Sequence, residues 1–169
     1  MADHGAGDTP TPSVEPKRVP IPRWAVRSIW ALERATYSVS GGRFVLRTPR
    51  ADRYGKLRLR TTGRRTGEER RAIVAYLEDG SDLLLMAMNG WTEPAPAWWL
   101  NLQAQPDATV DLPGGSRAVR ARVANEAERP RLWAKWTVLA GGGMGGDLDA
   151  YAAGIAHETP LVILEPRSA

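Results

Sequence analysis

Short segments of alternating apolar and polar residues, separated by glycine-containing turns, recur along most of this chain and constrain its fold more than any other feature. Two pairs of these segments are joined by turns that favour β-hairpins, at Asp79-Gly80 and at Pro113-Gly114-Gly115. The regular alternation of strand and helix that a doubly wound parallel sheet requires is missing. The pattern therefore predicts an α+β, mainly β protein, a barrel of about six mostly antiparallel strands with flanking helices.

The local pattern also predicts where the individual elements lie. We expect strands at residues 57–62, 71–77, 83–88, 108–112, 118–123 and 161–164, and a further strand around 44–47. We expect helices over residues 97–103, from 125 to about 139 and from 147 to about 156. Asn125 and Asp147 are the expected N-caps, because their side-chain oxygens can accept hydrogen bonds from N–H groups left unpaired at a helix start.

The N-terminal part of the chain differs in composition from the rest. Residues 1–22 contain five prolines among small and polar residues, which predicts a disordered or extended tail. Residues 23–40 are predicted to form a helix, and residues 41–169 a folded domain. Packing of this helix on the domain is the preferred interpretation, and peripheral contact with an anionic membrane through residues 23–38 is the alternative. No segment resembles a signal peptide or a membrane span, so a cytoplasmic protein is expected.

Composition excludes several kinds of active site. The chain has no cysteine, which rules out disulfides, thiolate nucleophiles and cysteine-ligated metals, and its only histidines are His4 and His157. No pair of carboxylates suited to acid–base catalysis is apparent, and no metal site is expected. Lysine and arginine exceed aspartate and glutamate by 23 − 19 = 4. Anionic small molecules fit this charge, whereas nucleic acid is not an expected partner because no long basic run is present.

An arginine-rich segment marks the expected binding site. The predicted strand at 57–62 leads into the loop Gly63-Arg-Arg-Thr-Gly67. Guanidinium groups bind phosphate or carboxylate through paired hydrogen bonds, and a hydroxyl and loop N–H groups can complete such a site. We therefore predict that Arg64, Arg65 and Thr66 bind an anion. Arg70 and Arg71 begin the next strand and could face the same loop; a solvated turn is the alternative.

Two further segments are candidate pocket walls. The first, Met86-Ala-Met-Asn89, ends a strand in small and flexible apolar residues, although ordinary core packing is the default for them. The second, Ala97-Trp-Trp-Leu-Asn101, lies on a helix, where successive residues point about 100° apart, so its two tryptophans cannot share a face. Asn101 must find a partner in the backbone or in a ligand. An anion site without catalytic side chains suggests that a cofactor carries the chemistry.

Taken in order, these motifs resemble the deazaflavin-dependent nitroreductase family. The resemblance covers roughly residues 40–166 and rests on Thr61-Thr-Gly-Arg-Arg-Thr-Gly67, Asp79-Gly80, Pro96-Ala-Trp-Trp-Leu-Asn-Leu102 with Gln105-Pro106, and Thr159-Pro-Leu-Val-Ile-Leu-Glu-Pro166. It implies a split β-barrel oxidoreductase that uses the 8-hydroxy-5-deazaflavin coenzyme (coenzyme F-420). The implied reaction is hydride transfer from the reduced coenzyme to an electron-poor small molecule such as a quinone or a nitro compound.

The resemblance also implies roles for individual residues. Arg64, Arg65 and Thr66 would hold the phosphate and acidic tail of the coenzyme, and Tyr151 would close the substrate side as the candidate catalytic residue. A homodimer is a further implication, since split barrels of this kind are often dimers. The residues implied to line the coenzyme are Arg70, Arg71, Ala72, Ile73, Val74, Ala75, Met86, Ala87, Met88, Asn89, Ala97, Trp98, Trp99, Leu100 and Asn101.

Two alternatives to this function remain open. A related split-barrel enzyme that uses FMN would have the same fold and could use the same phosphate site. A non-catalytic protein that binds or carries the coenzyme is the other alternative, because relatives often have a lysine where this chain has Asn89.

Overall fold

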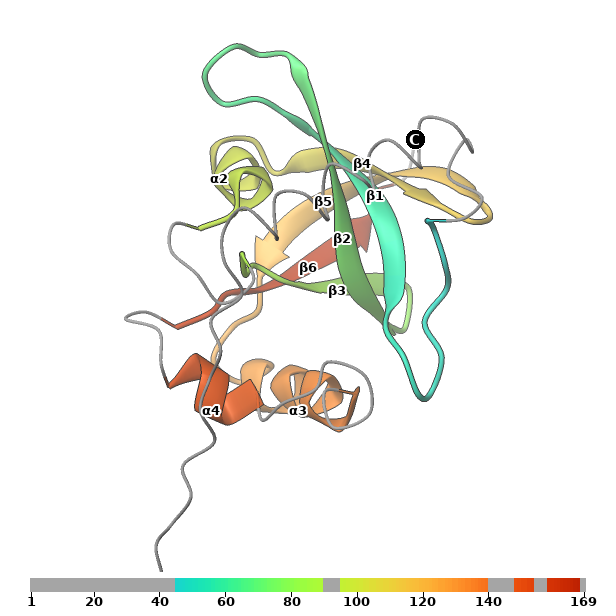
Figure 1. Ribbon diagram of the computed structural model, residues 1–169. Coiled ribbons are helices and arrows are strands. Elements are labelled where there is room, and N and C mark those ends of the chain that lie inside the picture. The colour runs from blue at the N-terminus through green and yellow to red at the C-terminus, as the bar shows by residue number, and fades with distance from the viewer. Residues whose placement is uncertain (1–44, 90–94, 140–147, 154–157, 168–169) are drawn as a thin grey trace, which may run out of the picture.

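The computed structural model describes residues 45–89, 95–139, 148–153 and 158–167. Within them, six strands form a closed barrel in the order β1-β2-β3-β6-β5-β4, with every neighbouring pair antiparallel (Figure 1). The strands are β1 (Gly55–Thr62), β2 (Glu69–Asp79), β3 (Asp82–Met86), β4 (Asp107–Leu112), β5 (Gly115–Val123) and β6 (Leu161–Pro166). The helices are α2 (Ala97–Ala104), α3 (Arg129–Leu139) and α4 (Leu148–Ala152). The predicted mainly β, antiparallel barrel is confirmed.

Five predicted strands are longer in the structure, which extends 57–62 to 55–62, 71–77 to 69–79, 108–112 to 107–112, 118–123 to 115–123 and 161–164 to 161–166. Two other predicted strands are shorter. β3 stops at Met86 instead of residue 88, because the next position opposite it in β6 is Pro160, which has no N–H to donate. The N–H of Ala87 still donates to Pro160 O at 2.9 Å. In the described part of the strand expected at 44–47, Arg47 forms only an isolated bridge to Lys56.

The predicted N-terminal tail, residues 1–22, and the helix at residues 23–40 lie outside the described residues, as does the expected cap Asp147. The division of the chain into tail, helix and a domain at 41–169 therefore stays a prediction. No helix in the described ranges combines the length and the hydropathy that a membrane span requires.

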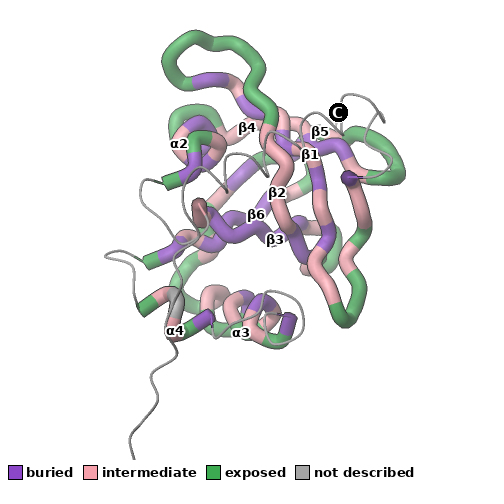
Figure 2. Tube along the Cα trace, viewed as in Figure 1, coloured by how far each residue is buried: buried purple, intermediate pink, exposed green. Residues whose placement is uncertain are grey.

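Strand alternation builds two apolar cores, one on each side of the barrel wall (Figure 2). One core fills the barrel and extends to α2, and the other lies between the outer wall and the pair α3 and α4. Figure 1 shows α2 at the upper left of the barrel and α3 with α4 below it. The interior core contains Leu57, Leu59, Tyr76, Leu83, Leu85, Ala87, Trp99, Leu102, Val110, Val119, Ala121, Val162 and Leu164. The outer core contains Leu77, Leu84, Met86, Leu132, Trp136, Leu139, Leu148, Leu161 and Ile163.

α3 begins at Arg129, four residues later than the predicted start at 125, and polar contacts hold the turn that leads into it. The predicted cap Asn125 accepts the N–H of Glu128 on Oδ1 at 2.9 Å, and Glu128 Oε2 accepts the N–H of Asn125 at 3.0 Å. This reciprocal pair is a capping box, which satisfies two N–H groups near the helix start. Arg122 donates to both oxygens of Glu128 at 2.7 and 2.8 Å, and this pairing lowers the pKa of Glu128 to about 2.

A second set of charges ties α3 to the β2–β3 hairpin. Asp79 accepts hydrogen bonds at 2.8 Å from Nη1 and Nη2 of Arg131, and Lys135 donates to the same carboxylate. The hydrogen bonds from Arg131 and Lys135 hold the pKa of Asp79 well below its usual range. The hairpin and the helix are thereby joined on the side of the barrel away from α2.

Candidate functional site

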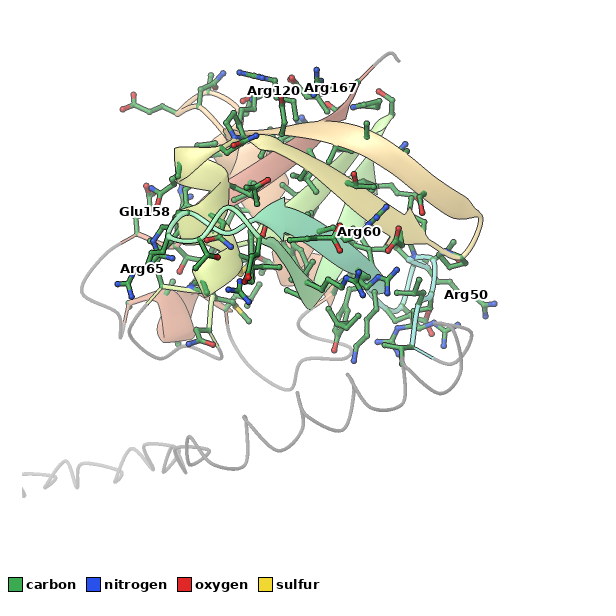
Figure 3. The ribbon with its side chains drawn as sticks, turned by 90° about the horizontal axis from the view of Figure 1, so that it is seen from above. Arg50, Arg60, Arg65, Arg120, Glu158 and Arg167 are labelled. Atoms are coloured by element: carbon green, nitrogen blue, oxygen red, sulfur yellow. The ribbon has the colours of Figure 1, made fainter. Side chains whose placement is uncertain are left out.

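The predicted anion loop connects β1 to β2 and is closed by its own backbone hydrogen bonds. The N–H of Gly63 donates to Glu68 O at 2.7 Å, and the N–H of Gly67 donates to Gly63 O at 2.8 Å. Gly67 has a φ of 71°, in the left-handed region where a residue with a side chain is strained. Arg65 projects away from the barrel wall (Figure 3). The loop therefore presents its arginines to solvent from a closed turn.

Arg64 and Arg65 differ from the arginines that follow them. Both are exposed, and among the described residues neither guanidinium has a carboxylate partner. Arg70 Nη2 lies 2.8 Å from Glu68 Oε2, and Arg71 Nε lies 2.6 Å from Glu69 Oε1. Neighbouring cations without a counter-ion repel one another, so the two free guanidinium groups favour a bound anion.

Strand alternation separates Arg70 from Arg71. Arg70 faces the loop as expected, since its Nη2 also donates to Thr66 Oγ1 at 3.2 Å. Arg71 pairs with Glu69 on the other face of β2, and its hydrogen bond lowers the pKa of Glu69. The expectation that both arginines face the loop is therefore corrected, because consecutive strand residues point to opposite sides.

Asn101 of α2 joins the helix to this loop. Its Oδ1 accepts the N–H of Arg64 at 3.2 Å, and its Nδ2 donates to Thr61 Oγ1 at 3.1 Å. Asn101 is 4% exposed and Thr61 is 3% exposed. Of the two kinds of partner expected for this amide, a backbone or a ligand, the structure supplies the backbone, together with a hydroxyl.

The residues expected to line the coenzyme along β2 also fall on two faces. Ala72 and Val74 lie opposite the inward-facing Leu59 and Leu57 of β1. Ile73 and Ala75 alternate with them, and Ala75 packs against the outer core. A ligand on one side of the barrel wall can therefore contact only half of this predicted segment through side chains.

The end of β3 is similarly divided. Ala87 belongs to the interior core, whereas Met86 belongs to the outer core and Met88 packs against it. The N–H groups of Ala87 and Met88 already donate to Pro160 O and Met86 O, both at 2.9 Å. These two N–H groups are therefore not available to a ligand, and Asn89, the last described residue here, is half-buried.

On α2, both tryptophans pack on the barrel. Trp99 is 7% exposed within the interior core, and Trp98 is half-buried against the same core. Ala97 is exposed and Leu100 is half-buried. Both tryptophans therefore contribute to the core, while Trp98 keeps part of its surface accessible on the helix that carries Asn101.

The structure does not bring Tyr151 next to the arginine loop. Its helix, α4, lies at the bottom of Figure 1, whereas the β1–β2 loop lies at the top, and the side chain of Tyr151 lies outside the described residues. α4 is tied to α3 by a hydrogen bond of 2.6 Å from Trp133 Nε1 to Asp149 Oδ1. Any joint site would have to extend along the barrel.

Sequence reasoning missed two residues of the loop site. Glu68, which is exposed, supplies the carboxylate that pairs with Arg70. Thr61, at the end of β1, supplies the hydroxyl partner of Asn101. Its inward position follows from the alternation of β1, but its partner is 40 residues away and could not be read from a local pattern.

Comparison with known proteins now decides the family. The profile of the F420H(2)-dependent quinone reductase family matches residues 30–166. This chain belongs to that family. A Mycobacterium tuberculosis protein named F420H(2)-dependent quinone reductase is 31% identical over 119 residues, which cover 67% of this chain and 78% of the relative.

Solved structures agree on the fold. The reductase FDR-A, described as F420-H2 dependent, superposes with a TM-score of 0.53 at 21% identity, over 65% of this chain and 93% of its own. A protein solved as a domain-swapped dimer gives a TM-score of 0.54 at 19% identity, over 82% of this chain and 99% of its own. The split-barrel oxidoreductase expected from the resemblance is thus confirmed, with the deazaflavin as the coenzyme of the family; the FMN alternative gains no support.

Proposed function

We propose that this quinone reductase family member transfers a hydride from the reduced deazaflavin coenzyme to a quinone, and that the tip of the β1–β2 loop holds the anionic part of the coenzyme. Family membership supports the reaction. The observation that carries the site is the pair Arg64 and Arg65, exposed on a closed loop without a carboxylate partner among the described residues. When bound, the deazaflavin supplies the hydride, and the protein supplies binding and orientation.

The residues of the loop fit an anionic group. Arg64 and Arg65 each offer several N–H donors in a planar arrangement that matches phosphate or carboxylate oxygens. Arg70 stands behind them and is shared between Glu68 and Thr66. The loop thus carries three arginines against one carboxylate, which leaves a local charge that an anion can neutralise.

We assign the wall next to the loop to α2. Trp98 is the partly accessible aromatic side chain of this helix, and an indole face suits a planar ring. Ala97 and Leu100 are the other two α2 residues with exposed surface among those predicted to line the coenzyme. Tyr151 is proposed for the substrate side, at a distance from the anion loop.

Titration of the purified protein with the oxidised coenzyme, followed by tryptophan fluorescence, tests the loop assignment. Arg65→Ala removes a charge-assisted contact, so we expect binding to weaken by about 1.5–3 kcal/mol. Arg120→Ala is the matched control, because Arg120 is an exposed arginine on β5 that pairs with Asp107. An unchanged dissociation constant in Arg65→Ala would refute the assignment, and a parallel titration with FMN tests the alternative cofactor.

The reaction is tested separately from binding. We expect the reduced coenzyme to be oxidised by quinones in the presence of the protein, in a stopped-flow measurement across a quinone series. Turnover would rule out the carrier alternative, and binding without turnover by any quinone would support it. The homodimer, the cytoplasmic location and the membrane contact through residues 23–38 stay predictions, and sedimentation velocity and vesicle co-sedimentation test the first and the last.

A further inference from the structure

We infer that Asn101 is a positioning residue that fixes the direction in which the loop presents Arg64 and Arg65, and that it does not itself contact the coenzyme. This inference rests on the proposed function of the loop. It replaces the role in coenzyme contact that the family resemblance implied for Asn101.

The first argument is how the loop is held. The N–H groups of Gly63, Thr66 and Gly67 are bonded within the loop, to Glu68 O and to Gly63 O. The N–H of Arg64 instead donates to Asn101 Oδ1, at 3.2 Å. The backbone at the first arginine is therefore oriented from outside the loop, by a side chain of α2.

The second argument is the chemistry of the side chain. Asn101 Oδ1 accepts the N–H of Arg64 at 3.2 Å, and Asn101 Nδ2 donates to the hydroxyl of Thr61 at 3.1 Å. The first partner lies in the loop and the second in β1. An ionised aspartate could accept at both ends but could not donate, whereas leucine could do neither. Because Thr61 is a hydroxyl that can rotate, it could donate to an aspartate instead. The site therefore tolerates a carboxylate better than an apolar group of similar size.

The third argument is burial. Asn101 and Thr61 are 4% and 3% exposed, so neither has a broad surface to offer a ligand. Trp99 and Leu102, which lie two residues before and one residue after Asn101 on α2, are buried in the interior core. The core thus holds α2 in place, and the hydrogen bonds of Asn101 hold the loop in a fixed position relative to α2. Breaking the amide contacts leaves the Arg64 N–H and the Thr61 hydroxyl without these partners, which favours rearrangement of the loop.

The closing experiment compares two probes on the full-length protein. One is the intact coenzyme, and the other is its 8-hydroxy-5-deazaflavin chromophore without the phosphate and acidic tail. Asn101→Leu should weaken binding of the intact coenzyme by about tenfold, the value of roughly one hydrogen bond. It should leave chromophore binding unchanged within about twofold. Ile163→Val is the control, because it removes packing in the outer core, on the other side of the barrel wall from the interior core that holds α2, and it should leave both affinities unchanged.

A second readout needs no ligand. Hydrogen exchange of the Arg64 amide, followed by NMR, should accelerate in Asn101→Leu, and Asn101→Asp should retain more of the protection. Thr61→Val should accelerate exchange of the same amide to a smaller extent. This variant can also be used for the test if Asn101→Leu does not fold. Unchanged exchange in both Asn101→Leu and Thr61→Val would overturn the inference.

The affinities for the intact coenzyme and for its chromophore also show whether a failure concerns the positioning role of Asn101 or the proposed function of the loop. Equal weakening of both probes by Asn101→Leu would place Asn101 against the ring and overturn the positioning role. Weakening by Arg65→Ala with no effect of Asn101→Leu would keep the anion loop and reject the positioning role. If Arg65→Ala itself has no effect, the proposed loop function fails, and the exchange of the Arg64 amide still decides whether Asn101 orders the loop.

Discussion

The balance of charge on the anion loop leads to a prediction about Glu68. Its Oε2 lies 2.8 Å from Arg70 Nη2, and the side chains of Glu68 and Arg70 are 68% and 54% exposed. Glu68 therefore competes with a bound anion for Arg70, and it places a negative charge beside Arg64 and Arg65. Glu68→Gln removes this charge, keeps the size of the side chain and releases Arg70. We expect the variant to bind the coenzyme more tightly.

The expected size follows from the exposure of the pair. An ion pair between exposed side chains is worth about 0.2–1 kcal/mol, so releasing Arg70 has little effect on folding. A unit charge about one Debye length from a bound anion repels it by about 0.4 kcal/mol in water, before screening. Together, the lost repulsion and the released guanidinium should contribute about 0.5–1.5 kcal/mol, which corresponds to roughly 2- to 12-fold tighter binding.

The assay is a titration with the oxidised coenzyme at low and at high ionic strength. The gain from Glu68→Gln should shrink at high salt, because both contributions act between exposed charges. Glu126→Gln is the control, since it changes the net charge equally at an exposed position before α3. Weaker or unchanged binding by Glu68→Gln at low salt would refute the reasoning, and would mean that the pair organises the loop.

Three further predictions concern stability and turnover. A Cβ on Gly55 would overlap the ring of Tyr76, so Gly55→Ala should lower the free energy of unfolding by about 1–3 kcal/mol, as measured by urea denaturation. Gly114→Ala is the control: no atom lies near its added Cβ, and the free energy of unfolding should change by less than about 0.5 kcal/mol. The lowered pKa of Asp79 means that its ion pairs stabilise the fold above the unfolded-state pKa of about 3.9 and lose this effect as the pH falls further. Asp79→Asn should therefore be less stable by about 1 kcal/mol at neutral pH, and the difference should shrink below about pH 4; a difference independent of pH would contradict this. Tyr151→Phe should change turnover more than coenzyme affinity, and the reverse pattern in kinetics and titration would place Tyr151 in the coenzyme site.

The barrel could be predicted from sequence as far as its hairpins are local. The Asp79-Gly80 turn is present with Gly80 at a φ of 66°, and the turn before Gly115 joins β4 to β5. Which distant strands pair to close the barrel could not be predicted, because β6 pairs with both β3 and β5, and β4 pairs with β1, across long stretches of chain. Such pairings depend on tertiary packing and leave no mark in a local pattern.

The same division holds for the candidate site. The position of the arginine loop could be predicted from a strand that leads into a segment with two glycines. Which of the arginines pair with a carboxylate could not be predicted, because it depends on how the side chains lie in the fold. In the described part of the chain, Arg70 is neutralised by a carboxylate only two positions away, whereas Arg64 has no such partner. The contact of Asn101 with Thr61 spans 40 residues, so its existence depends on how α2 packs on the barrel.

An unpaired guanidinium is not enough to define a binding site in this protein. Arg50, at the opposite end of the molecule from Arg65 (Figure 3), is also exposed and without a carboxylate partner in the described part of the chain. Arg50 is held by a local backbone bridge to Arg53. What distinguishes the loop is that it places two such arginines next to each other and that the buried side chain of Asn101 joins its backbone to α2. Ordering a flexible loop on binding costs free energy, and a loop already ordered by the fold avoids that cost. The anion site is therefore defined by the combination of free charge and fixed backbone.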